Sequence, residues 1–131
     1  MSLLGTQPVS AAVGVMHYGM TQLPAQYAPI ASSQASAKTI APAPAAGWTI
    51  VVLAYSITCG ATANTWNFQS HTTTSVATGI HALPINGSIV APYCPAGLFA
   101  CAPGEALDIL LTGATAVGGE LTYVIVPPSV D

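Results

Sequence analysis

The chain has 131 residues, about the length of one ordinary domain, and 52% of them are hydrophobic while only 4% are charged. It contains one lysine and no arginine and has a formal net charge of −3, so it lacks the clustered basic side chains that contact phosphates. Nucleic acid is therefore excluded as a partner. The high apolar fraction also argues against a disordered chain, which would bury too little surface to fold.

The longest apolar run, Ile50 to Tyr55, is far shorter than the roughly 20 residues of a membrane-spanning helix. We therefore expect no membrane partner. The N-terminus lacks the basic region that begins a signal peptide, which favours a soluble protein made in the cytoplasm. Because so little charge would keep free monomers apart, we expect other subunits to cover much of the surface.

Residues 1–46 are predicted to form an extended N-terminal arm. They contain five prolines and show no sustained helical or strand period, and proline disfavours long helices. A mobile tail is the alternative, but the segment carries many apolar side chains that are costly to leave in water. We expect these to contact another chain: Met16, Tyr18, Met20, Leu23, Tyr27 and Ile30.

From residue 47 to residue 131, short apolar runs alternate with turn residues, which predicts an all-β antiparallel sandwich, jelly-roll-like, with seven or eight strands. The first run is apolar at both alternating positions, as in a strand covered on both faces. Alternation also predicts that Trp48 and Trp66 are internal. Asn86-Gly87 predicts a tight hairpin turn. The expected strands are 48–58, 64–70, 75–83, 88–93, 97–102, 105–112 and 120–126.

Three of the five charged side chains lie between residues 105 and 120, where we predict a hairpin between the last two strands. Alternation places Asp108 and Glu120 on the face away from the core and Glu105 at a turn, so these charges should mark surface that stays wet. Leu110 and Val124 share the outer face, and we expect a partner to cover them. The predicted inward positions are Leu107, Ile109, Leu111, Leu121, Tyr123 and Ile125.

The cysteines Cys59, Cys94 and Cys101 are expected to be reduced thiols, because nothing indicates secretion. A disulfide between Cys94 and Cys101 is the alternative. Their spacing does not match the closely paired ligands of a zinc site, and neither does the spacing of His71 and His81. We therefore expect no metal and no cofactor.

No catalytic residues are predicted, and the protein is not expected to be an enzyme. A hydrolytic triad needs an acid beside a histidine, and the few acids are assigned to the surface. Asp108 and Glu120 could be proposed as the carboxylate pair of a glycosidase, but no aromatic-rich cleft is indicated near them.

A resemblance to a known class covers roughly residues 47–126. The segments "GWTIVVLAYSITCGATANTWNFQS", "GEALDI" and "VGGELTYV" resemble small structural proteins of tailed bacteriophages, namely capsid decoration (cement) proteins of β-sandwich type. These proteins sit on the capsid shell as dimers or trimers. The match leaves the predicted arm uncovered.

The resemblance implies a virion protein on the outer capsid surface that stabilises the head by bridging major capsid subunits without covalent bonds. The implied partners are the major capsid protein and further copies of the chain, with a homotrimer favoured over a dimer. The first alternative is a tail or fibre module that binds a host receptor or glycan. The second is a hydrolase on a sandwich scaffold.

Overall fold

The computed structural model describes residues 15–18, 21–74 and 78–128, and all regular elements in these ranges are β-strands, which confirms the predicted all-β class. No helix that could cross a membrane occurs in this part of the chain. The strands are β1 (Val15–Tyr18), β2 (Thr21–Pro24), β3 (Gln26–Ser32), β4 (Ala37–Ala41), β5 (Thr49–Cys59), β6 (Asn64–Ser70), β7 (His81–Leu83), β8 (Ser88–Ala91), β9 (Phe99–Ala100), β10 (Leu107–Leu111) and β11 (Val117–Val126).

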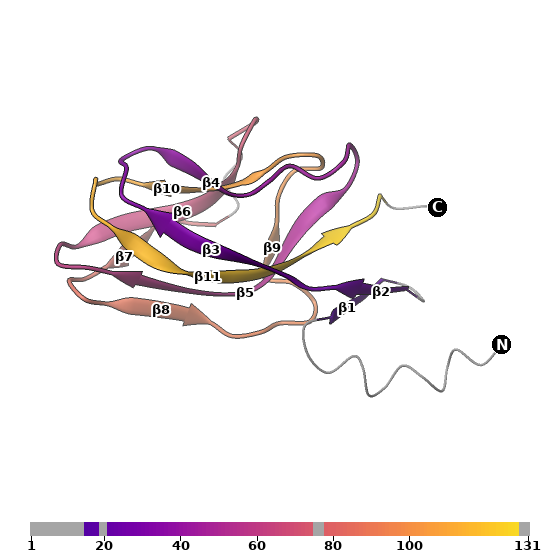
Figure 1. The fold of residues 1–131 in the computed structure, drawn as a ribbon, viewed down its shortest axis with the longest axis horizontal. Helices are drawn as coiled ribbons and strands as arrows, with labels where there is room; N and C mark the ends of the chain where they lie inside the picture. The colour runs from indigo at the N-terminus through magenta and orange to yellow at the C-terminus, as the bar shows by residue number, and fades with distance from the viewer. Residues whose placement is uncertain (1–14, 19–20, 75–77, 129–131) are drawn as a thin grey trace.

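Beyond the β1–β2 hairpin, the strands form two antiparallel sheets that face each other (Figure 1). The first has the order β4-β10-β6-β7, and the second has the order β3-β11-β5-β8, with β9 also paired to β5. Counted from β3, the pairing is nested: β3 pairs with β11, β4 with β10, β5 with β8 and β9, and β6 with β7. This nested pairing is a long ribbon rolled into two sheets, which is a jelly roll.

The predicted start of the sandwich at residue 47 is wrong. β3 pairs with β11 along its whole length and β4 pairs with β10, so both sheets contain strands from the predicted arm. Ala28, Ile30 and Ala41 are buried in the core. Proline misled the prediction because Pro29 lies on an edge strand, where a missing amide need not cost a ladder hydrogen bond. Residues 1–14 lie outside the described part of the chain.

The core fills the space between the two sheets and is centred on aromatic rings. Tyr55 of β5 meets Trp66 and Phe68 of β6 edge-on, with ring centroids 5.6 and 5.2 Å apart. Phe99 stacks on Phe68 at 5.2 Å. Such edge-on and offset pairs stabilise more than their buried area alone. The six inward positions predicted on β10 and β11 all contact this core.

A β-bulge explains why β5 is apolar on both faces. Its pairing with β11 passes from Ala54 directly to Val52, so Leu53 is an extra residue without a partner. Val52 and Ile57 therefore both face the core, whereas Leu53 faces the outside of the sheet.

The outward-facing Leu53 is covered by the same chain. It packs with Val124 of β11 and with Leu23 of β2, and all three side chains are buried. Another subunit is not needed to bury this residue. The chain supplies the cover itself, because β2 lies beside β11 (Figure 1).

Both predicted hairpins are corners between the sheets. β7 and β8 belong to different sheets, and so do β10 and β11. At the first corner the Gly87 amide donates to the Pro84 carbonyl (2.9 Å), and Asn86 has a positive φ of 55°. Asn86 thus has the expected left-handed backbone, but the turn redirects the chain to the other sheet.

Candidate interaction surfaces

Asp108 is not solvent-exposed, so the prediction that it marks hydrated surface is wrong. It is only 1% exposed, and it lies in a central strand between Thr39 of β4 and Gln69 of β6. One carboxylate oxygen accepts a hydrogen bond from the Thr39 hydroxyl (2.8 Å), and the other lies 2.7 Å from Nδ1 of His71. Alternation gave the correct face, but it could not reveal partners that are distant in the chain.

Glu105 also has an internal partner. Its Oε1 accepts hydrogen bonds from the backbone amides of Thr72 and Thr73 (3.0 and 2.8 Å) and from the Thr73 hydroxyl (3.1 Å). This carboxylate therefore fixes the turn that follows β6, as an acidic side chain does when it caps free amides.

The His71–Asp108 pair resembles the histidine and the acid of a hydrolytic triad. In a triad the nucleophilic hydroxyl bonds to the imidazole, whereas the Thr39 hydroxyl bonds to the carboxylate. The pair instead connects β4, β10 and the end of β6. Asp108 and Glu120 are not a glycosidase pair, because they lie on the outer faces of different sheets. No group of three metal-ligating side chains occurs within the described ranges.

Three of the residues predicted to contact another chain are buried within this one. Ile30 lies in the main core, while Leu23 and Val124 lie in the smaller cluster with Leu53. These three predictions are wrong, because the segment that was expected to be an arm packs on its own sandwich.

The remaining predicted contact residues stay candidates. Tyr27 is 70% exposed on β3, and Leu110 is half-buried on β10. Met16 and Tyr18 lie in β1, and Met20 lies outside the described residues.

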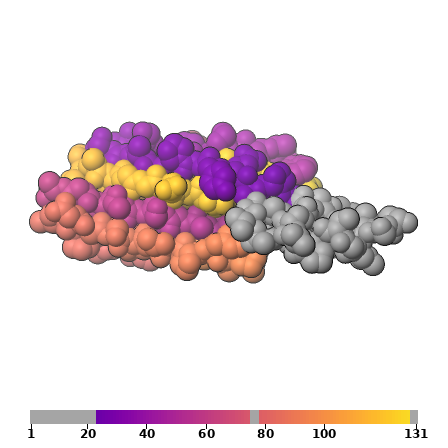
Figure 2. All heavy atoms as spheres, turned by 60° about the horizontal axis from the view of Figure 1, so that its bottom comes forward, coloured from indigo at the N-terminus to yellow at the C-terminus, as the bar shows by residue number. Residues whose placement is uncertain are grey.

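The lateral edge formed by β7, β8 and β9 is apolar and uncharged. Among the residues whose exposure the structure describes, five of the seven exposed large hydrophobic side chains lie between residues 80 and 98, and the sequence has no Asp, Glu, Lys or Arg from 39 to 104. Figure 2 shows this edge in salmon and orange along the lower margin. Soluble proteins normally protect exposed strand edges with charges, bulges or a covering segment. The five side chains are Ile80, Ile85, Val90, Tyr93 and Leu98.

The opposite edge, formed by β3 and β4, is protected by a proline and a charged side chain. Pro29 interrupts β3, and the exposed Lys38 lies on β4, where it lines a shallow groove with Ser32, Ser33 and Val117. A lysine and a proline on edge strands discourage further strand pairing.

The outer face of the second sheet carries a trough of about 260 Å³. Across its strands, Glu120 of β11 lies opposite Ser56 of β5, which lies opposite Val90 of β8. Ala54, Pro92 and Thr122 also line the trough. Small side chains on β5 form the floor, and the larger Val90 and Pro92 stand along one side.

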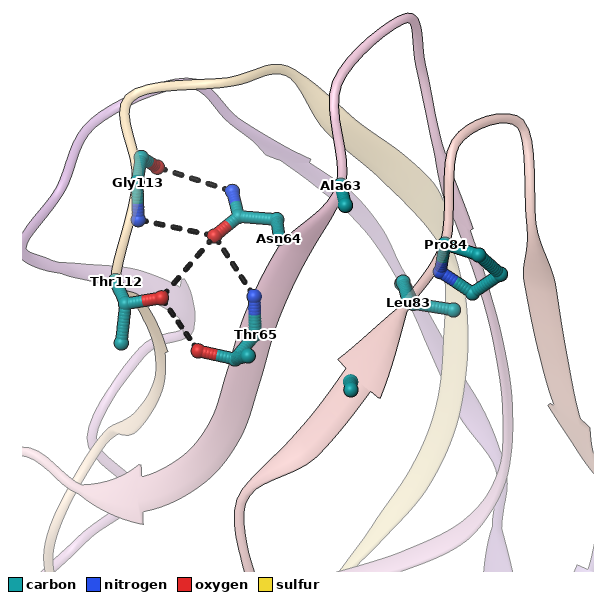
Figure 3. A pocket seen from close by; sticks show the side chains of 8 residues that line it. Ala63, Asn64, Thr65, Leu83, Pro84, Thr112 and Gly113 are labelled. Atoms are coloured by element: carbon teal, nitrogen blue, oxygen red, sulfur yellow. Dashed lines mark hydrogen bonds between the residues drawn. The ribbon is translucent and has the colours of Figure 1, made fainter.

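A second hollow of about 440 Å³ lies near the start of β6 (Figure 3). Asn64 lines this hollow, but the polar atoms of its side chain already form hydrogen bonds within the protein. Its Oδ1 accepts hydrogen bonds from the backbone amides of Thr65 and Gly113, both at 2.9 Å. Nδ2 donates to the carbonyls of Gly113 and Thr115 at 3.0 and 3.2 Å. The hydroxyls of Thr65 and Thr112 bond to each other. Asn64 therefore has a structural role, because it holds the loop after β10.

The three cysteines are free thiols, as expected. Burial raises the pKa of Cys101 to about 11. A hydrogen bond with Ser70 opposes this shift, and the negative charges of Glu105 and Asp108 add to it. At neutral pH this thiol is therefore protonated and a poor nucleophile.

No family model matches this chain, and no curated protein matches it either. One similar solved structure comes from a study described as "Bacillus endospore appendages form a novel family of disulfide-linked pili". It is 19% identical, the match covers 82% of this chain and 89% of that chain, and the TM-score is 0.46.

Proposed function

We propose that this protein is a structural subunit that decorates the head of a tailed bacteriophage, where it bridges major capsid subunits through apolar surface. The observation that carries the proposal is the edge formed by β7, β8 and β9, with five exposed large hydrophobic side chains and no charge. An edge of this kind favours association in a free monomer. It suits a protein whose working state is an assembly.

The remaining chemistry of the chain supports a structural role. Of the two acids on β10 and just before it, one is buried in hydrogen bonds and the other fixes a turn, so both hold the fold together. A jelly roll supplies a rigid body of the kind found in viral capsid domains. The sequence resemblance to decoration proteins gives the proposal its specific setting on a phage head.

The test is to locate the protein on particles. Antibodies raised against the purified full-length chain would be used for immunogold electron microscopy of phage from the strain that encodes it. Labelling over the whole head is expected. Particles without any label would overturn the proposal.

A receptor- or glycan-binding fibre module is the second candidate, and Trp48 favours it. This side chain was predicted to be internal but is 37% exposed, and Tyr27 is exposed as well. Exposed aromatic rings are common in sites that recognise sugars through an apolar face. This candidate predicts gold label at the tail tip and loss of glycan binding in Trp48→Ala.

A further inference from the structure

Four of the five charged side chains lie in the described part of the chain, and they fall into two groups. Asp108 and Glu105 have internal hydrogen-bond partners. Lys38 and Glu120 are exposed, and neither has an ion-pair partner among the described residues. In a chain with only five charged side chains, two of opposite sign are thus left for contacts outside the fold.

The trough around Glu120 has the chemistry that a lysine side chain requires. Val90, Pro92 and Ala54 offer apolar surface for the hydrocarbon part, and Glu120 offers a negative charge for the ammonium group. The hydroxyls of Ser56 and Thr122 belong to the same trough and can accept hydrogen bonds from an ammonium. Lysine commonly packs its stem on apolar surface while its charged end contacts a polar group.

The Lys38 side chain is positioned to contact another molecule. It is exposed on the edge strand β4, beside a shallow groove whose walls are Ala31, Ser32, Ser33 and the start of β11. It is also the sole lysine in a chain that has no arginine. Any side-chain ammonium that a second copy brings to the trough must therefore be Lys38.

We propose that the trough is occupied by a second copy of this chain, whose Lys38 pairs with Glu120. The apolar surface around the pair provides most of the affinity, and the pair selects the register, since exposed ion pairs add specificity more than stability. The contact joins unlike parts of the two copies, so it can close into a ring or a reciprocal dimer. It concerns self-association, and it holds whether the assembly is a phage head or another structure.

Charge reversal tests the pair. Wild-type protein at about 100 µM in about 0.05 M salt, where screening is weak, is expected to sediment as an oligomer. Lys38→Glu and Glu120→Lys should each weaken association about tenfold, because like charges then meet across the contact. The double variant should regain wild-type association. An equimolar mixture of the two single variants should regain it as well, since each supplies the charge that the other lacks.

Ala45→Glu is the matched control, because it adds a carboxylate at an exposed position in the loop between β4 and β5. It should associate like wild type. If a reversed variant misfolds by circular dichroism, Lys38→Met and Glu120→Gln replace it, and each should weaken association less than reversal does. A monomeric wild-type protein, single variants that associate normally, or a mixture that stays monomeric would each overturn the proposal.

Discussion

The two lateral edges of this jelly roll differ in the side chains that they expose to solvent. The edge of β3 and β4 carries a proline and the single lysine, whereas the edge of β7, β8 and β9 carries five exposed hydrophobic side chains and no charge. Both edges end the same two sheets, so the fold itself does not demand this difference. It indicates that the edge of β3 and β4 (the guarded edge) is protected against further strand pairing, whereas the edge of β7, β8 and β9 (the open edge) is not.

We expect stability to depend on the central strands of each sheet and association to depend on the open edge. The largest loss of stability should then come from substitution of Gly119. Its φ is +154°, and a Cβ there would overlap the backbone carbonyl of Ser56 on β5. Gly119→Ala should cost more than about 3 kcal/mol or prevent folding, because the β11–β5 pairing must shift. Urea unfolding followed by circular dichroism measures the change, and Gly79→Ala, in open space, is the control.

The guarded edge should also contribute strongly to stability. Ile30 of β3 is 2% exposed in the core, so Ile30→Ala should lower the free energy of unfolding by about 2–5 kcal/mol. Val90→Ala, at the open edge, removes a side chain that is 68% exposed and should change stability by less than about 0.5 kcal/mol. Equal losses in the two variants would remove the contrast between the edges.

A lysine added to the open edge should impair assembly without unfolding the protein. Ile85 is 60% exposed at the corner between β7 and β8. If the protein decorates a phage head as proposed, Ile85→Lys should weaken binding to particles that lack the wild-type protein about tenfold while leaving the urea midpoint unchanged. Ala43→Lys, in the exposed loop after β4, adds the same charge near the guarded edge and should bind normally. Equal binding by both variants would contradict the assignment of the open edge.

The smallest effect concerns Cys101, just after β9. Because its pKa is about 11 in the folded protein and 9.0 without burial, the unfolded chain ionises first as pH rises. The associated stability is complete below pH 9 and is lost between about pH 9 and pH 11. Urea unfolding at pH 8 and pH 10 should show a decrease that is smaller, by about 1 kcal/mol, in Cys101→Ala. An identical pH dependence in the two proteins would show that Cys101 is not shielded.

From residue 47 onward, local pattern predicted the positions of the strands better than their connections. Alternation identified the inward residues of β6, β10 and β11 because period two is set by the backbone of a single strand. It could not show that β10 and β11 lie in different sheets, because strand pairing depends on residues far away in the chain. The prolines before residue 47 concealed β3 and β4 for a related reason: an edge strand tolerates what a central strand does not.

The candidate surfaces were harder to predict than the fold. Val124 was predicted to contact another chain, but Leu23 and Leu53 of the same chain cover it. The β-bulge that turns Leu53 outward has no clear signal in the sequence. Asp108 is buried instead of exposed because Thr39 on β4 and His71, just after β6, contact it. The open edge did leave a signal, namely the absence of charge from residue 39 to residue 104. That stretch contains all three strands of the edge.

The position of the final strand has a consequence for synthesis of the chain. β11, the last strand of the two sheets to be synthesised, lies in the middle of its sheet between β3 and β5, and β10 lies inside the other sheet. β3, the first strand of the two sheets, can pair only after β11 has been made, since Gln26 pairs with Tyr123, 97 residues later. The sandwich therefore cannot close before β11 has left the ribosome. Contacts of such long range also make folding slow. Newly made chains whose apolar strands are still unpaired are therefore prone to aggregate until β11 has been made.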